Sequence, residues 1–110
     1  MSKASAAPAD PAPVFAALGD RTRLSLLVTL SDGMTRSIAS LSAHTRLTRQ
    51  AVTKHLRVLE DAGLVGSARI GRETLFGYRP EPVVEARSYL EQVETQWDDA
   101  LSRLRSFVER

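Results

Sequence analysis

The chain has 110 residues, enough for one compact core, and it contains no cysteine, which excludes a disulfide framework and a thiolate metal site. Because it has neither a signal-like N-terminus nor an apolar run of about 18 residues, we expect a cytoplasmic protein with no membrane partner. The net charge of +2 is uneven, since residues 21–79 contain ten Lys or Arg and four Asp or Glu, a net +6, whereas residues 80–110 contain four and seven, a net −3.

Residues 1–13, MSKASAAPADPAP, combine small residues with three prolines and show no apolar periodicity, so we expect a disordered tail. The remaining residues, 14–110, are expected to form one domain. It should begin with a short helix that ends at Gly19. One face of this helix is apolar and contains Val14, Phe15 and Leu18.

Two further helices are expected before the middle of the chain. Asp20 is a candidate N-cap for the first of them, which ends near Gly33. Thr35 can cap the second, a short helix that buries Ile38 and Leu41. The first of the two has a broad apolar surface suited to the domain centre, made of Leu24, Leu26, Leu27, Val28 and Leu30.

Residues 48–64, TRQAVTKHLRVLEDAGL, predict a helix with two opposed faces, capped by Thr48 and closed by Gly63. The apolar face must pack on the domain and contains Ala51, Val52, Leu56, Val58, Leu59 and Ala62. The polar face contains Arg49, Gln50, Thr53, Lys54 and Arg57. Such a helix fits the major groove of DNA, where Arg, Gln and Thr side chains can read base edges. The alternative for this helix alone is a surface helix with a solvated basic face.

A turn over residues 44–47 joins this helix to the short one before it, which is the helix-turn-helix pattern. Residues 64–70 and 74–78 then predict a hairpin around a three-residue connection, Gly-Arg-Glu. A hairpin in this place is a wing, and Arg72 at its tip and Arg69 nearby can touch phosphates or a minor groove. Solvated charge that protects a strand edge is the alternative for both arginines.

Residues 82–109 predict a final helix of about 27 residues, about 40 Å long, with Pro82 at its first position. Its apolar residues recur at intervals of three and four: Leu90, Val93, Trp97, Ala100, Leu104 and Phe107, widened by Leu101 and Val108. This seam is longer than so small a domain can cover, so part of it should fold back on the first helix and part should meet a second copy of the chain. The expected dimer interface comprises Val14, Phe15, Leu90, Val93, Trp97, Leu101 and Leu104.

Together these elements predict a mainly α fold with a small β-hairpin. Three segments, FAALGDRTRLSLLVTL, LTRQAVTKHLRVLEDAGLV and GRETLFGY, make residues 14–109 resemble the ArsR family of winged helix-turn-helix repressors, and the middle segment is the specific one. The resemblance implies a homodimer that binds a palindromic operator, usually near its own promoter, and that is often released by a metal ion or another inducer. By position it assigns DNA contacts to Thr48, Arg49, Gln50, Thr53, Lys54 and Arg57, with Arg72 in the wing.

Three places depart from the family pattern. Members that sense metals through thiolates carry paired cysteines in the helix before the recognition helix, and residues 38–43 contain none. Members that sense zinc through the last helix use Asp and His pairs, and residues 82–110 contain no histidine. We therefore expect no metal site and no cofactor. The third departure is Arg46, where relatives commonly have glycine, so the turn is expected to carry strain or to follow a different path.

Few residues suggest other chemistry. His55 falls inside the apolar arc of its helix, which favours a packed imidazole bonded to a backbone or side-chain group, and His44 should be exposed in the turn. Trp97 is expected to anchor a core or a dimer interface rather than to line a cofactor pocket. No nucleophile motif, glycine-rich phosphate loop or paired-carboxylate arrangement stands out, so we do not expect an enzyme.

The basic middle of the chain predicts a polyanionic partner, although membrane surfaces also attract basic segments. We expect a dimeric transcriptional regulator, a repressor that binds double-stranded DNA at a palindromic operator and controls its own gene. One alternative is a protein-interaction module in which the winged helix is a scaffold without specific DNA readout. Another is an activator or nucleoid-type binder of weak specificity. A scaffold would not need five polar or basic side chains on one face of a helix, which favours DNA. The sequence identifies no inducer.

Overall fold

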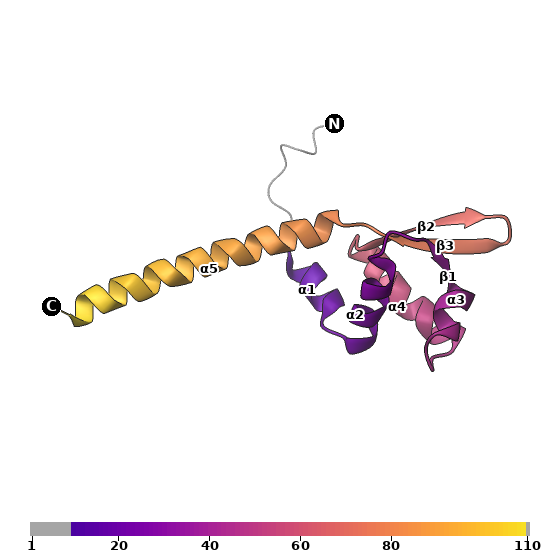
Figure 1. Cartoon of the computed structure of the whole chain (residues 1–110), viewed down its shortest axis with the longest axis horizontal. Coiled ribbons are helices and arrows are strands. Elements are labelled where there is room, and N and C mark those ends of the chain that lie inside the picture. Colours follow the sequence, from indigo (N-terminus) through magenta and orange to yellow (C-terminus); the bar gives the residue numbers. More distant parts are fainter. Residues whose placement is uncertain (1–9, 110) are drawn as a thin grey trace, which may run out of the picture.

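The computed structural model describes residues 10–109, which form helices and short strands (Figure 1). In chain order the elements are α1 (Ala12–Leu18), α2 (Arg21–Leu30), β1 (Arg36–Ser37), α3 (Ile38–Ala43), α4 (Arg49–Asp61), β2 (Val65–Ile70), β3 (Glu73–Tyr78) and α5 (Glu81–Val108). The predicted fold class is therefore confirmed: the protein is mostly helical, with a small sheet and a long C-terminal helix.

The predicted starts of the first and last helices need correction. Residues 1–9 of the predicted tail lie outside the described residues, but α1 already begins at Ala12, so the helical part starts before residue 14. Proline does not prevent this early start, because the first turn of a helix needs no N–H from Pro11 or Pro13. In the same way α5 begins at Glu81, which places Pro82 inside the first turn rather than at its first position.

Side chains cap the helices that surround the core. The predicted caps are confirmed for α2, where Asp20 accepts the N–H of Arg23 at 2.9 Å, and for α4, where Thr48 accepts the N–H of Ala51 at 3.1 Å. The predicted cap of α3 is wrong. The cap is Ser37 rather than Thr35, and its hydroxyl accepts the N–H of Ser40. The helix begins later than expected because Arg36 and Ser37 first pair with β3 as a strand.

The sheet has three antiparallel strands in the order β1-β3-β2. The sequence predicted only the hairpin of β2 and β3, since a two-residue strand such as β1 shows no alternation that could identify it. The hairpin turn is also tighter than expected. Ile70 pairs with Glu73, which leaves the two residues Gly71-Arg72 as the connection. Gly71 has a φ of +63°, as the first central position of a type II′ turn requires.

One apolar core lies between α1, α2, α4, the sheet and the start of α5. Its completely covered side chains come mainly from α4 and its neighbours and are Leu30, Val52, Leu56, Leu59 and Leu64. Leu24 and Val28 of α2 and Val58 of α4, predicted for apolar faces, are exposed. These helices pack on one side only, so the outer edges of the predicted apolar surfaces reach solvent.

The long helix α5 leaves the domain after its first turns. Near its start Ala86 is buried, Val83 packs against the core, and the rings of Phe15 and Tyr89 have centroids 6.2 Å apart. The predicted fold-back onto α1 is therefore confirmed for this end. Figure 1 shows the rest of α5 projecting away from the other elements, which stretches the molecule to 69 × 39 × 21 Å. None of the described helices, α5 included, is both long and apolar enough to cross a membrane.

Candidate nucleic-acid interface

Helix α4 presents a row of polar side chains to solvent. Arg49, Gln50, Lys54 and Arg57 are exposed, and no hydrogen bond or ion pair within residues 10–109 engages their side chains. The two threonines of the predicted set differ, because their hydroxyls already serve the helix. The Thr48 hydroxyl caps the first turn, and the half-buried Thr53 donates its hydroxyl to the carbonyl of Arg49 at 2.7 Å. Four long side chains are thus available to an outside partner.

The opposite face of α4 holds that row in place. Val52, Leu56 and Leu59 are 0 % exposed, so the helix cannot rotate without opening the core. The helix ends where predicted, at Gly63, whose φ is +78°. Its N–H reaches the carbonyl of Glu60 and the N–H of Leu64 reaches that of Leu59, both at 2.9 Å, as in a Schellman end.

The turn before α4 is built from hydrogen bonds that the sequence did not show. Ser42 donates its hydroxyl to the carbonyl of Leu47 at 3.0 Å, and the N–H of Leu47 donates to the hydroxyl of Thr45 at 3.2 Å. The density of Ser and Thr in this stretch was the signal that could have identified these residues. Arg46 does not adopt a left-handed backbone conformation, since every positive φ among the described residues belongs to a glycine. The strain expected at Arg46 is therefore not observed.

The wing and α4 meet at a groove of about 370 Å³ that also touches α3. Arg49 and Thr53 line it from α4, and Arg72 lines it from the hairpin turn. Three of the eight predicted DNA-contacting residues thus share one groove. Three others, Thr48, Gln50 and Lys54, line a neighbouring hollow on α4.

The remaining members of the predicted set lie outside both hollows. Arg57 is exposed further along α4, and Arg69 bends back along the wing, where its Nε donates to the carbonyl of Gly71 at 3.3 Å. The sequence did not indicate Glu73, an acidic residue that lines the groove beside Arg72. A carboxylate there disfavours phosphate and suits a donor such as the cytosine amino group.

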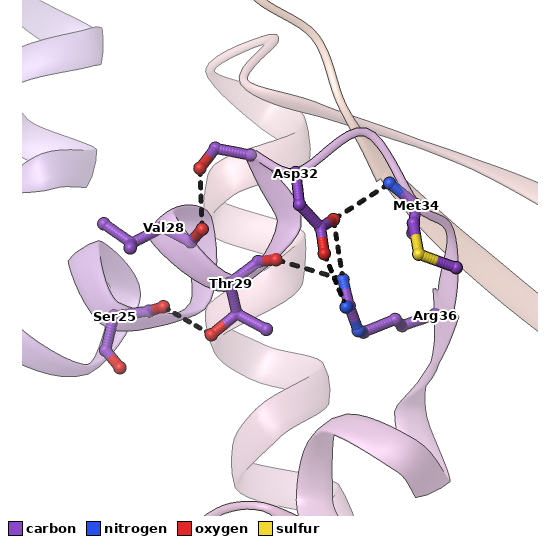
Figure 2. Close-up of polar contacts among 7 residues, drawn as sticks. Ser25, Val28, Thr29, Asp32, Met34 and Arg36 are labelled. Carbon is purple, nitrogen blue, oxygen red and sulfur yellow. Dashed lines mark hydrogen bonds and ion pairs between the residues drawn. The ribbon is translucent and has the colours of Figure 1, made fainter.

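Two arginines in the basic part of the chain, residues 21–79, make hydrogen bonds within the protein. Figure 2 shows Arg36 donating to both carboxylate oxygens of Asp32, at 3.0 and 2.7 Å, and to the carbonyl of Thr29. The hydrogen bonds from Arg36, together with the N–H of Met34 at 2.9 Å, lower the pKa of Asp32 to about 2. The contacts of Arg36 also fix the chain between α2 and β1. Arg23 donates its Nε to the carbonyl of Ala17 at 2.7 Å at the end of α1. Neither side chain belongs to the outward basic surface.

His55 lies on the inner side of α4, half-buried as its place on the helix predicted. Its Nδ1 is 3.8 Å from a carboxylate oxygen of Asp20, the cap of α2, which is an ion-pair distance rather than a hydrogen bond. The N–H of Arg23 is the main reason why the pKa of Asp20 is lowered, and His55 adds a smaller contribution. His44 is exposed. Within residues 10–109 no three His, Asp or Glu side chains converge as a metal ion would need.

Known proteins share this arrangement. A family model described as "Bacterial regulatory protein, arsR family" matches residues 20–67. The HTH-type transcriptional regulator YuzN of Bacillus subtilis, itself uncharacterized, is 41% identical in an alignment 76 residues long that covers 64% of this chain and 83% of that protein. An ArsR-like transcriptional regulator from Rhodococcus sp. RHA1 superimposes with a TM-score of 0.78 at 35% identity, over 88% of this chain and 91% of that one.

A further structural neighbour is described by its oligomeric state. The homodimeric winged helix-turn-helix DNA-binding domain of Mb0332 from Mycobacterium bovis has a TM-score of 0.62 at 25% identity, over 77% of this chain and 78% of that domain. The matched segment of the family model spans α2 to the start of β2 and so contains the helix-turn-helix. The relatives are named as transcriptional regulators, not as enzymes. The family model and these relatives together show that this chain belongs to the ArsR family of transcriptional regulators.

Proposed function

We propose that this regulator is a homodimeric repressor that binds a palindromic operator and controls its own gene from the cytoplasm. The observation that carries the proposal is the face of α4: Arg49, Gln50, Lys54 and Arg57 point outward from a helix whose other side is locked into the core. A rigid, exposed helix of this kind is what the major groove of DNA accepts. A protein-interaction scaffold has no use for such a face.

The residues of the interface divide by reach and chemistry. Arg49 and Gln50 lie in the first turn of α4, the part of a recognition helix that contacts base edges. Arginine pairs with guanine and glutamine with adenine through two hydrogen bonds each, which discriminate by about 1–3 kcal/mol. Lys54, Arg57 and Arg72 are assigned to phosphates, and Arg69, on the same hairpin as Arg72, joins this set. Thr48 and Thr53 support this surface through their roles in the helix.

Dimerisation supplies the second half-site. Within residues 10–109, the large apolar side chains that follow Tyr89 on α5 remain largely exposed, and a second copy offers the same surface. Of the interface residues expected from the sequence, Leu90, Val93, Trp97, Leu101 and Leu104 are exposed, Phe15 is partly covered by Tyr89, and Val14 is already buried in the protomer. Val14 therefore supports the interface from within. The homodimer of the Mycobacterium bovis neighbour favours this assembly.

Footprinting tests the proposal directly. The purified protein should protect one inverted repeat in the DNA upstream of its own gene, with two half-sites about one helical turn apart. Arg49→Ala with Gln50→Ala should abolish this protection while leaving the folded protein unchanged in circular dichroism. Adding the protein to in-vitro transcription from that promoter should reduce the transcript. Uniform, sequence-independent protection would favour a nucleoid-type binder, stimulated transcription would indicate an activator, and no protection of any DNA would favour the interaction module.

A further inference from the structure

A groove away from the DNA-facing surface has its own chemistry. It has a volume of about 500 Å³, within the range of small-molecule sites, and it lies where the start of α1, the end of α4 and the first turns of α5 meet. Its apolar wall includes Val14, Pro82, Val84 and Tyr89. Neither α4's DNA-contacting residues nor the wing reach it.

Among residues 10–109, every charged residue that lines this groove is acidic. Asp10 comes from the residues before α1, Asp61 from the last position of α4, and Glu85 from α5. Among the described residues none of the three makes an ion pair, although the chain is basic as a whole. The end of α4 adds partial negative charge from its backbone carbonyls, and an aspartate at that end is the opposite of what the helix dipole favours.

We propose that this groove binds a small organic cation with an aromatic or aliphatic body. The three carboxylates attract the charge and the apolar wall covers the body, while Tyr89 adds an aromatic ring to the lining, a group that attracts quaternary ammonium ions. A metal ion does not fit, because no three ligating side chains converge here or elsewhere in residues 10–109.

The groove lies between the two helices on which the proposed function depends, α4 for DNA binding and α5 for dimerisation. Asp61 belongs to the recognition helix, and Tyr89 precedes Leu90, the first residue of the exposed seam of α5. A ligand that holds these elements together shifts the angle between the DNA-reading helix and the dimerisation helix. The effect on DNA rests on the proposed function, whereas binding of the cation does not.

Calorimetry without DNA tests the site by itself. The probe is (4-hydroxybenzyl)trimethylammonium, and its uncharged isostere, 4-neopentylphenol, is the matched ligand. We expect saturable binding of one cation per chain and roughly tenfold weaker binding of the isostere. Asp61→Asn with Glu85→Gln should weaken binding of the cation by a similar factor and leave binding of the isostere unchanged.

Matched changes outside the groove separate the site from general acidity. Glu91→Gln with Glu94→Gln removes the same charge from α5 without touching the lining, and cation binding should stay within about twofold of the native protein. Equal binding of both ligands, equal losses in both variant pairs, or no saturable binding would each overturn the proposal. Failure here with an intact operator footprint would leave the proposed function standing.

Discussion

Helices α4 and α5 are both amphipathic, but within residues 10–109 only the apolar face of α4 packs into the core along its length. On α4 the apolar side chains Leu56 and Leu59 are fully covered by the protomer and the polar face is open. On α5 beyond Tyr89 the apolar side is open as well, with Trp97 63 % exposed and Phe107 69 % exposed. An open polar face suits a polyanion, and an open apolar face suits a second apolar surface. The two helices therefore indicate two different partners.

Charging the seam of α5 should have the largest effect. Leu101→Glu with Leu104→Glu should give a folded monomer whose operator affinity falls by at least about a hundredfold, because the new charges are buried only in the dimer and because two linked half-sites combine their affinities. Sedimentation velocity and fluorescence anisotropy measure the two effects. Ser102→Glu with Ser106→Glu adds the same charge on the opposite face of α5 and should leave the dimer intact. Equal losses in both pairs would contradict the assigned interface.

The core of α4 should respond differently from the seam. Leu56→Ala should lower the free energy of unfolding by about 2–5 kcal/mol, as expected for a buried leucine, and this loss should not depend on protein concentration. Val58→Ala, an exposed site on the same helix, should change the free energy of unfolding by no more than about 0.5 kcal/mol. Urea titrations at two protein concentrations measure both. Comparable losses from the two variants would mean that α4 packs with a different face.

Two single changes separate base readout from phosphate contact. Gln50→Ala should cost about 1–3 kcal/mol at one base step per half-site and relax specificity there. Arg72→Ala should weaken binding to all sequences similarly and flatten the dependence of log K on log salt by about one unit per bound wing. Anisotropy titrations on a panel of operator variants at several salt concentrations distinguish them. Indistinguishable losses on every variant would contradict the division of roles.

Acid should reveal the hydrogen-bonded pair of Asp32 and Arg36. The folded-state pKa of Asp32, about 2, lies below its ordinary value of 3.8, so its contribution to stability is present above that value and is lost as the pH falls toward 2. Asp32→Asn should therefore remove part of the fall in melting temperature between pH 4 and pH 2. Asp99→Asn, an exposed change on α5, is the control. Identical melting curves for native protein and Asp32→Asn across this range would contradict the assignment.

Metal ions and thiol oxidants should have no effect on operator binding. The chain has no cysteine, and the last helix has no histidine. Affinity should stay within about twofold when stoichiometric Zn²⁺, Cd²⁺ or arsenite is added, since metal sensing needs several converging ligands. Gel-shift titrations with and without a chelator measure this. A tenfold change that the chelator reverses would establish a metal site that is not expected from the sequence.

Local signals in the sequence predicted most of the elements. The caps Asp20 and Thr48 and the terminating Gly63 depend on a few neighbouring residues, so a single sequence contains enough information to place them. Strand β1 could not be predicted in this way, because two residues become a strand only when β3 lies beside them. Without β3 as a partner, the sequence indicates Thr35 as the cap of α3, whereas the structure uses Ser37.

The candidate site divides in the same manner. The polar face of α4 follows from the helical period, and Arg72 from the hairpin. The groove that unites Arg49, Thr53 and Arg72 depends on how the wing folds against α3 and α4, which no local pattern encodes. The exposure of Val58 and Leu24 likewise depends on which neighbours each helix has.

Sedimentation equilibrium of the native protein tests the central claim most directly, namely that α5 is completed by a second copy of the chain. At tens of micromolar the protein should sediment with twice the mass of one chain, which is 12.1 kDa. The dissociation constant of the dimer should rise in the variant Leu101→Glu with Leu104→Glu. A native protein that remains monomeric at these concentrations and still protects a full palindrome would contradict the account of the long helix.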